Sequence, residues 1–344
     1  MTTQVPVESN KERRMNMLYN TLQPKIYIIH ENNEWIPPFA AAFKRAGVEF
    51  DEIYLVDGAI ALDTPPPNGV FWSRLSASSH TRNHTFSKEY GRSLLRWLES
   101  YGRCVINGSN VLEFEVSKVA QYLALNKAGF KVPKTIATFS KQDLLQRAKE
   151  LPTPFITKHN QGGKGLGVRL FENVGSLQEF VESSEFESSC DGIVLLQEYI
   201  ESKEPFITRL EFIDGAFVYA VRVDTSNGAF ELCPADACAL EQARPSFAGA
   251  ACDVGSAQKF RLQEDIDSTH PLVAALEQFL QQHNIQIAGI EFMRNKQDEL
   301  VVYDINTNTN YNSLVESALV AQGKLSAADR VVQFLHNRLQ HIKG

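Results

Sequence analysis

Two acidic residues and one amide lie inside apolar segments near the end of the chain. Glu291 falls within IAGIEFM, and Asp304 and Asn306 fall within LVVYDIN. Residues two apart on a strand share one face, and the intervening turn brings the strand of Glu291 alongside Asp304 and Asn306. The alternative is that these side chains are solvated strand residues, and this would be the better interpretation of a single carboxylate. Two half-buried charges, however, are costly without a cation. Carboxylate and amide oxygens suit Mg²⁺, so the three are predicted metal ligands.

A glycine-rich segment, QGGKGLG, could place backbone amides against phosphate. Its glycines are Gly162, Gly163, Gly165 and Gly167. It lacks the Lys-Ser/Thr pair of a P-loop, and the strand-like VRLFEN after it differs from the helix that follows a dinucleotide-binding motif. An ordinary flexible turn is the alternative. The flanking Lys158, His159 and Lys164 favour a mobile hairpin tip that folds over a polyphosphate.

A polar loop, FWSRLSASSHTRNH, follows an apolar strand in the first hundred residues. Open α/β sheets bind ligands in the loops at the carboxyl ends of their strands. Hydroxyl, imidazole and guanidinium groups in this loop could hold a small carboxylate, although the loop could also be a solvated connector. The candidate substrate residues are Arg74, Ser78, His80 and Arg82.

Apolar spacing predicts the elements that position these groups. KIYIIH, VEFDEIYLV, GVFWSRL and CVING are predicted strands, and WIPPFAAAFKRAG and EYGRSLLRWLESYG are predicted helices between them. This alternation predicts a small parallel α/β domain. From Leu112 the pattern changes to one helix over EFEVSKVAQYLALNKAG, followed by a strand–glycine loop–strand unit. The last third contains a hairpin turning at Asp214-Gly215, the helix PLVAALEQFLQQH and a second hairpin.

The fold class is therefore α/β throughout, in three lobes. We expect a flexible N-terminal segment over 1–24, a parallel α/β domain over 25–112, a central lobe with the glycine flap over 113–192, and a C-terminal lobe with the metal site over 193–344.

Composition excludes several classes of protein. The net charge of −7 disfavours a nucleic-acid surface, and no apolar run approaches the length of a membrane span. No apolar region follows the basic residues near the N-terminus, so a signal peptide is not expected. The five cysteines are irregularly spaced, which disfavours a zinc site and predicts reduced thiols in a cytoplasmic protein. They are Cys104, Cys190, Cys233, Cys238 and Cys252.

In order and spacing, these segments resemble the ATP-grasp superfamily, and most closely the RimK-like and glutathione-synthetase-like carboxylate–amine ligases. The resemblance runs from about Lys25 to Ala318 and is strongest from Glu115 to Asn308. Its most specific parts are SKVAQYLALNKAGFKVPKT, ITKHNQGGKGLGV, LLQEYIESKEPFITRLEF and IEF…VVYDIN. It implies the ATP-grasp fold, in which an N-terminal parallel α/β domain is followed by two α+β lobes that clasp ATP.

The resemblance also implies roles for individual residues. Lys118 and Lys158 would contact the ATP phosphates from two sides, and Glu204 would bind the ribose. The implied ATP-binding set is Lys118, Lys158, Gly162, Gly163, Gly165, Gly167, Gln197, Glu198, Tyr199, Ile200 and Glu204. Arg209 and Arg222 would be catalytic residues facing the reacting phosphoryl or acyl group. Glu291, Asp304 and Asn306 would hold Mg²⁺ or Mn²⁺.

The implied reaction joins a small carboxylate to an amine or amino acid through an acyl-phosphate, and it releases ADP and phosphate. The alternatives are a carboxylate kinase, an acyl–thiol ligase or a non-catalytic nucleotide-binding protein. The sequence leaves open whether the protein is a homo-oligomer. Two departures from the family stand out. Asp304 replaces the usual Glu, with no Pro-Gly after Asn306, and an Ala- and Cys-rich segment replaces a short basic one, which disfavours a poly-acidic acceptor.

Overall fold

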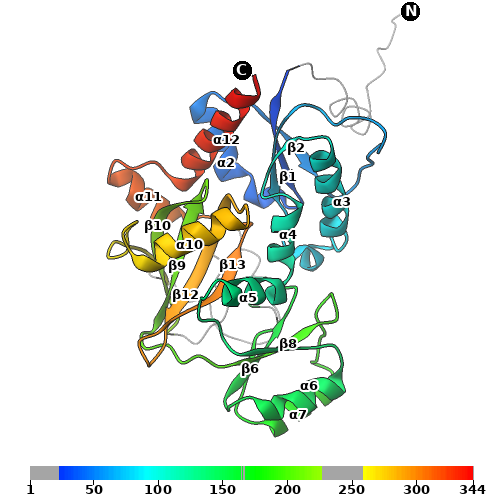
Figure 1. Ribbon diagram of the computed structural model, residues 1–344, viewed down its shortest axis with the longest axis vertical. Helices are drawn as coiled ribbons and strands as arrows, with labels where there is room; N and C mark the ends of the chain where they lie inside the picture. Colours follow the sequence, from blue (N-terminus) through cyan, green and yellow to red (C-terminus); the bar gives the residue numbers. More distant parts are fainter. Residues whose placement is uncertain (1–22, 164, 166, 227–258, 344) are drawn as a thin grey trace, which may run out of the picture.

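A computed structural model describes residues 23–163, 165, 167–226 and 259–343. Residues 1–22 of the segment predicted to be flexible, Lys164 of the glycine segment, and Cys233, Cys238 and Cys252 lie outside this part of the chain. The described residues form three sheets, with the N-terminal sheet and the sheet of β6 and β8 at opposite ends of the molecule (Figure 1). Within the described residues, no helix is both long and apolar enough to cross a membrane.

The N-terminal sheet is parallel, with the strand order β2-β1-β3-β4. Its strands are β1 (Lys25–His30), β2 (Phe50–Tyr54), β3 (Gly69–Arg74) and β4 (Cys104–Ile106). The helices α2 (Pro37–Ala46) and α3 (Ser87–Ser100) and the short 3₁₀ turns η1 (Asn33–Trp35) and η2 (Ser79–Arg82) connect them. Prolines open α2 and Gly47, with φ 62°, closes it. The predicted parallel domain is confirmed, and α12 (Ala327–Lys343) packs against α2.

The predicted single helix over 113–129 is wrong. It consists of α4 (Ser109–Val116) and α5 (Lys118–Lys127), because Ser117 adopts an extended conformation between them. The Ser117 hydroxyl accepts a hydrogen bond from the Ala120 amide and so caps α5. This break sets Lys118 at the first turn of α5, where its side chain points into the cavity described below.

The central sheet is antiparallel, with the order β5-β8-β6-β7. Its strands are β5 (Thr135–Thr138), β6 (Phe155–His159), β7 (Arg169–Phe171) and β8 (Val194–Glu198), and α6 (Lys141–Arg147), η3 (Ala148–Glu150) and α7 (Val174–Glu182) cover it. The glycine segment joins β6 to β7, as the strand–loop–strand prediction expects. Strand β8 pairs with β5 and β6, so the boundary expected at residue 193 falls before a strand of this sheet rather than after the sheet.

The third sheet is antiparallel, with the order β11-β10-β9-β12-β13. Its strands are β9 (Phe206–Ile213), β10 (Ala216–Asp224), β11 (Phe260–Gln263), β12 (Ile287–Arg294) and β13 (Leu300–Asn306). Asp214 and Gly215 turn the β9–β10 hairpin with φ values of 56° and 71°, which confirms the predicted turn.

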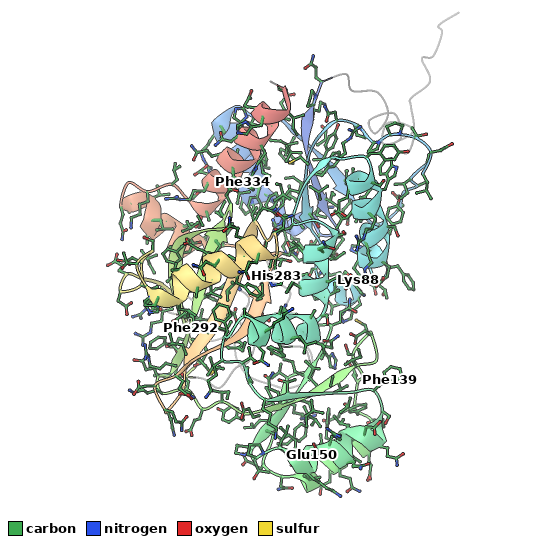
Figure 2. All side chains as sticks on the ribbon, in the orientation of Figure 1. Lys88, Phe139, Glu150, His283, Phe292 and Phe334 are labelled. Atoms are coloured by element: carbon green, nitrogen blue, oxygen red, sulfur yellow. The ribbon has the colours of Figure 1, made fainter. Side chains whose placement is uncertain are left out.

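The two faces of the third sheet have different neighbours. Helix α10 (Pro271–Gln282) packs on one face through an apolar cluster that includes Phe279 and Phe292. The His283 ring lies 4.5 Å from that of Phe279 in a tilted arrangement, and Figure 2 labels Phe292 and His283. The other face packs partly against α12 and α11 (Ser313–Ala321) through Ile213, Tyr219 and Ile287. The rest of this second face is polar and borders the cavity.

Candidate active site

A cavity of about 410 Å³ lies between the central sheet and the third sheet. Thirteen of the residues predicted to bind ATP, to hold metal or to catalyse line it. They are Lys118, Lys158, Gly162, Gly163, Gly165, Gln197, Glu198, Tyr199, Ile200, Arg209, Glu291, Asp304 and Asn306. The structure thus brings together segments from α5, β6, β8, β9, β12 and β13 that are far apart in the chain.

The predicted metal ligands lie on neighbouring strands. Glu291 of β12 and Asp304 of β13 are directly opposite each other, and Asn306 is opposite Gly289. Residues opposite each other in an antiparallel pair have side chains on the same face at close range. The Lys118 ammonium forms an ion pair with Asp304. The two carboxylates and the Asn306 amide therefore share one patch of the cavity wall.

Arg209 lies at the centre of a buried polar network on β9. Its guanidinium donates from Nε to Glu211 at 2.6 Å and from Nη1 to Glu291 at 3.0 Å. Its Nη2 donates to the Thr309 hydroxyl at 2.6 Å, and that hydroxyl donates to Glu211 at 2.9 Å. Only 2% of the Arg209 side chain is exposed. A guanidinium can only donate hydrogen bonds, and acceptors hold this one on three sides. The orientation of the Arg209 side chain is therefore preorganised.

The close approach of Arg209 to β12 depends on Gly289. A β-carbon at Gly289 would lie 2.7 Å from the guanidinium carbon of Arg209, which is closer than real contacts allow. Any side chain at this position would displace a buried arginine whose partners are themselves buried. The glycine therefore provides the space in which the guanidinium lies.

The surrounding charges shift the two carboxyl groups in opposite directions. Burial raises the pKa of the Glu291 carboxyl, and the neighbouring Arg209 only partly opposes this. Burial would also raise the pKa of Asp304, but Lys118 and Lys158 outweigh it and the pKa is lowered. Two carboxylates and an amide fit Mg²⁺, which takes one or two protein carboxylates together with phosphates. Among the described residues no group of three or more His, Cys, Asp or Glu side chains could hold a metal alone.

Lys158 approaches the cavity from the central sheet. Its ammonium donates to the Tyr122 hydroxyl at 3.2 Å and lies 5.9 Å from the ring centroid of Tyr303. Burial alone would lower the pKa of Lys158, but Tyr122 and Asp304 outweigh burial and raise it. The Lys158 ammonium therefore lies against aromatic side chains, and its charge remains available to an anionic ligand.

The glycine segment borders the cavity next to β6, with Gly162, Gly163 and Gly165 in the lining. Gly167 has a φ of 70°, and a β-carbon there would lie 2.5 Å from Cγ of the His159 ring. The Thr157 hydroxyl donates to the Gly167 carbonyl at 3.2 Å and holds this end of the segment. At Gly163 the nearest atom to an added β-carbon would be Cβ of Ser78, at 3.6 Å. The segment thus reaches from its own sheet to the loop after β3. Gly167 itself does not line the cavity.

Residues Gln197 to Ile200 line the end of the cavity away from Arg209, as the family resemblance implies. Ile156, Leu170 and Met293 add an apolar surface there. The Glu198 carboxylate accepts a hydrogen bond from the Lys134 amide at 2.7 Å, which ties the end of β8 to the segment before β5. A flat aromatic group fits an apolar slot with backbone groups at its edge.

The structure does not bring Arg222 or Glu204 to the cavity. In the β9–β10 pairing Arg222 is opposite Thr208, whereas Arg209 is opposite Val221. Side chains alternate along a strand, so Arg222 faces the opposite side of the sheet from Arg209. It is exposed and its guanidinium lies 3.7 Å from the ring centroid of Phe206. Glu204 is exposed and is not among the residues that line the cavity.

The predicted substrate residues also lie outside the cavity lining. Arg74 is buried, and burial lowers its pKa to about 9, which still leaves it protonated at neutral pH. Arg82 donates to the buried Glu31 carboxylate at 2.5 Å and to the Ser78 hydroxyl at 3.2 Å. One buried ring nitrogen of His80 has no hydrogen-bond partner among the residues that the structure describes. Arg74 and Arg82 are thus held by other groups of the protein, and Ser78 borders the glycine segment at Gly163.

Among the lining residues that the sequence analysis did not select are two polar ones, Glu115 and Asn310. The Glu115 carboxylate accepts hydrogen bonds from the Thr307 amide at 2.8 Å and its hydroxyl at 2.9 Å, and from the Asn308 amide at 3.2 Å. The signal available in the sequence was the polar run after Asn306, where the family has Pro-Gly.

Part of the chain is similar in sequence to known proteins. Residues 116–234 match the family of the RimK-like ATP-grasp domain. A curated relative, alpha-aminoadipate–LysW ligase LysX of Sulfurisphaera tokodaii, is 32% identical over 123 residues, which are 36% of this chain and 43% of the relative. This match thus spans less than half the length of that relative.

Solved structures match over most of the chain at low sequence identity, which shows the fold. A RimK domain ATP-grasp protein from Sphaerobacter thermophilus has a TM-score of 0.60 and 16% identity, over 90% of this chain and 98% of that one. D-cycloserine synthetase DcsG gives 0.60 and 16%, over 91% and 99%. ATP-grasp ligase PsnB, complexed with a minimal precursor, gives 0.61 and 14%, over 92% and 99%. The chain therefore has the ATP-grasp fold, and its residues 116–234 are similar to the RimK-like ATP-grasp domain.

Proposed function

We propose that this protein is an ATP-dependent carboxylate–amine ligase that forms an amide bond through an acyl-phosphate and releases ADP and phosphate. The observation that carries the proposal is the content of one cavity. The cavity is lined by the cations Lys118, Lys158 and Arg209, by the paired carboxylates Glu291 and Asp304, and by a glycine segment between two strands. This combination suits a triphosphate and a divalent cation, with the nucleotide base at the Gln197–Ile200 end.

Each group has a separate task in this proposal. Lys158 and Lys118 bind the phosphates, and the glycine segment closes over them with its backbone amides. Glu291, Asp304 and Asn306 would hold Mg²⁺ or Mn²⁺, which when bound would offset charge on the transferring phosphoryl group. Arg209, fixed by Glu211 and Glu291, holds positive charge at the reacting end of the cavity. Arg222 has no part in this proposal.

The chemistry begins with attack of a carboxylate oxygen on the γ-phosphorus. A new P–O bond forms and the bond between the γ-phosphorus and the β–γ bridging oxygen breaks, so ADP leaves. The amine nitrogen then attacks the acyl carbon, phosphate leaves with the C–O bond electrons, and the amine loses a proton. Closure of the glycine segment excludes water, which would otherwise hydrolyse the acyl-phosphate.

The finer assignments are proposals as well. The relatives named above include a ligase named for alpha-aminoadipate and LysW, a ligase complexed with a minimal precursor, and a D-cycloserine synthetase. We propose a small carboxylate and an amine or amino acid as substrates, and a cytoplasmic location, where ATP is abundant and thiols such as Cys104 and Cys190 stay free. We propose the three-lobe division too, with the end of the central lobe moved to the end of β8.

A product assay tests the proposed function. The protein is incubated with Mg-ATP and acetate, succinate, L-aspartate, L-glutamate or N-acetyl-L-glutamate, with hydroxylamine as the amine. We expect ADP, phosphate and a hydroxamate, because hydroxylamine traps an acyl-phosphate. AMP and pyrophosphate would mean adenylation and would overturn the proposal, as would the absence of acid-dependent nucleotide cleavage. An arm without hydroxylamine distinguishes a carboxylate kinase, which would release ADP equally well.

A further inference from the structure

The loop after β13 places one asparagine in the cavity wall. Residues 307–309 are buried polar residues, and Asn310 follows them and lines the cavity. Thr309, the preceding residue, accepts the hydrogen bond from Nη2 of Arg209. Asn310 therefore lies at the Arg209 end of the cavity, away from the apolar slot at Gln197–Ile200.

Arg74 determines which way the Asn310 amide faces. Its Nη2 lies 2.7 Å from Oδ1 of Asn310. A guanidinium only donates hydrogen bonds, so the amide must present its oxygen to Arg74 and direct its N–H₂ group elsewhere. The described residues supply no hydrogen-bond acceptor for this N–H₂ group.

Arg74 itself cannot turn away. Its Nε donates to Asn308 at 3.1 Å, Nη1 to the Trp35 carbonyl at 3.2 Å and Nη2 to the Thr309 carbonyl at 3.0 Å. Its guanidinium lies 4.4 Å from the ring centroid of Phe39. A buried guanidinium that donates from all three of its nitrogens keeps one position, so the orientation of Asn310 is fixed before any ligand binds.

We propose that Asn310 is a specificity-determining residue whose amide N–H₂ donates to a carboxylate oxygen of the acid substrate, and that Arg74 is the positioning residue that fixes this orientation. The inference rests on the proposed ligase function. A donor recognises an acceptor, so the group bound here is a carboxylate rather than the incoming amine. A phosphate oxygen of ATP has the same hydrogen-bonding chemistry, and the test below separates the two sources.

The test compares two isosteric substitutions, Asn310→Asp and Asn308→Asp. Both keep an oxygen toward Arg74, but only Asn310→Asp replaces a donor facing the cavity by a charged acceptor. With the acid that the wild type uses best in the hydroxamate assay, we expect Asn310→Asp to raise the KM for the acid about 10- to 100-fold. The KM for Mg-ATP and the melting temperature should stay close to wild type, and Asn308→Asp should behave as wild type.

A third variant tests the positioning role. Arg74→Gln offers Asn310 both a donor and an acceptor, so the amide can turn over. Its KM for the acid should rise as well, and the double variant Arg74→Gln/Asn310→Asp should show less than the product of the two single effects. If Arg74→Gln does not fold, the pair of aspartate variants still decides the role of Asn310.

Several outcomes would overturn the inference. One is a higher KM for Mg-ATP with an unchanged KM for the acid, which would assign Asn310 to the nucleotide. Others are equal impairment of both aspartate variants, which would indicate a structural role of the loop, and no effect of Asn310→Asp. Inactivity of the wild type with every acid overturns the proposed function, and this inference with it, so the two failures are distinguishable.

Discussion

The two walls of the cavity hold their charges in opposite ways. On the wall formed by the third sheet and the start of α5, the cations already have carboxylate partners: Arg209 pairs with Glu291, and Lys118 pairs with Asp304. On the wall formed by the central sheet, Lys158 forms no ion pair within the described residues and meets the Tyr122 hydroxyl instead. The charges of the third-sheet wall are therefore neutralised before a ligand binds, whereas the central-sheet wall presents the positive charge of Lys158.

This difference separates stability from activity. Removing one partner of a buried ion pair leaves an uncompensated charge, which destabilises the protein as well as the site. Removing a cation that interacts mainly with aromatic groups lowers the stability of the protein little. It lowers activity, because the cation is needed when an anionic ligand binds. Variants on the third-sheet wall should therefore lose both properties, whereas variants on the central-sheet wall should lose activity alone.

We expect the largest effect from Asp304→Asn. Turnover should fall by at least about a hundredfold, because the variant loses a charge that would hold the divalent cation. The free energy of unfolding should also fall, because Lys118 keeps its charge without a partner. The decrease should be smaller than the roughly 3–5 kcal/mol of a fully buried pair, since 21% of the Asp304 side chain is exposed.

ADP release at saturating Mg²⁺ and a thermal melt check both parts of the Asp304 prediction. Full activity in the variant, or a wild type that keeps its activity in EDTA, would show that these carboxylates hold no essential metal. A melting temperature equal to that of the wild type would contradict the description of this wall as already neutralised.

Lys158→Ala should lower activity strongly and stability little. Losing a charge-assisted contact with a phosphate should weaken Mg-ATP binding about 10- to 100-fold. The lost hydrogen bond to Tyr122 and the cation–π contact should together cost only about 1 kcal/mol. Calorimetric titration with Mg-ATP and a melt measure the two effects, with the exposed Lys149→Ala as a matched control. Unchanged nucleotide affinity would remove Lys158 from the site.

The glycine segment offers a matched pair on the central-sheet wall. Gly167→Ala should reduce kcat several-fold, because alanine is strained at a φ of 70° and its β-carbon would meet the His159 ring. Gly163→Ala should stay within about twofold of wild type, because the nearest atom to its added β-carbon, Cβ of Ser78, lies 3.6 Å away. Steady-state kinetics on both variants measure this contrast. Equal losses would mean that flexibility of the segment matters rather than space at one position.

Periodic patterns in the sequence predicted the architecture well. The alternation of strand and helix patterns predicted the parallel sheet, and Asp214-Gly215 predicted the β9–β10 hairpin. Both features are determined by residues that are close together in the chain. The break at Ser117 was missed because the apolar pattern continues through it, and the cap that makes it is a single hydroxyl. Asp304 and Asn306 followed from a spacing that fixes their strand face, whereas Lys118, Arg209 and residues 197–200 were implied only by the family resemblance.

Residues whose partners are distant in the chain could not be placed in the same way. The loop after β3 has the composition of a binding loop, yet Arg74 is held by residues 308–310, more than two hundred positions away. No local pattern distinguishes an arginine that binds a ligand from one that binds the protein. For the same reason the polar run after Asn306 marked this loop as unusual but did not predict that Asn310 would line the cavity.

The smallest effect should come from Arg222→Ala, which compares the two faces of one sheet. Arg222 and Arg209 lie on adjacent strands, but Arg222 is exposed on the opposite face and stacks on Phe206. Losing this exposed stacking should cost about 0.5–1 kcal/mol of stability. Both kcat and the KM for Mg-ATP should stay within about twofold of wild type.

Arg209→Lys is the matched variant on the cavity face. It keeps the positive charge that Glu211 and Glu291 require but loses the planar fork that contacts Glu211, Glu291 and Thr309 at once, so kcat should fall while much of the stability remains. A tenfold loss in Arg222→Ala together with a fully active Arg209→Lys would mean that the reaction takes place on the other face. The cavity face would then have no part in catalysis.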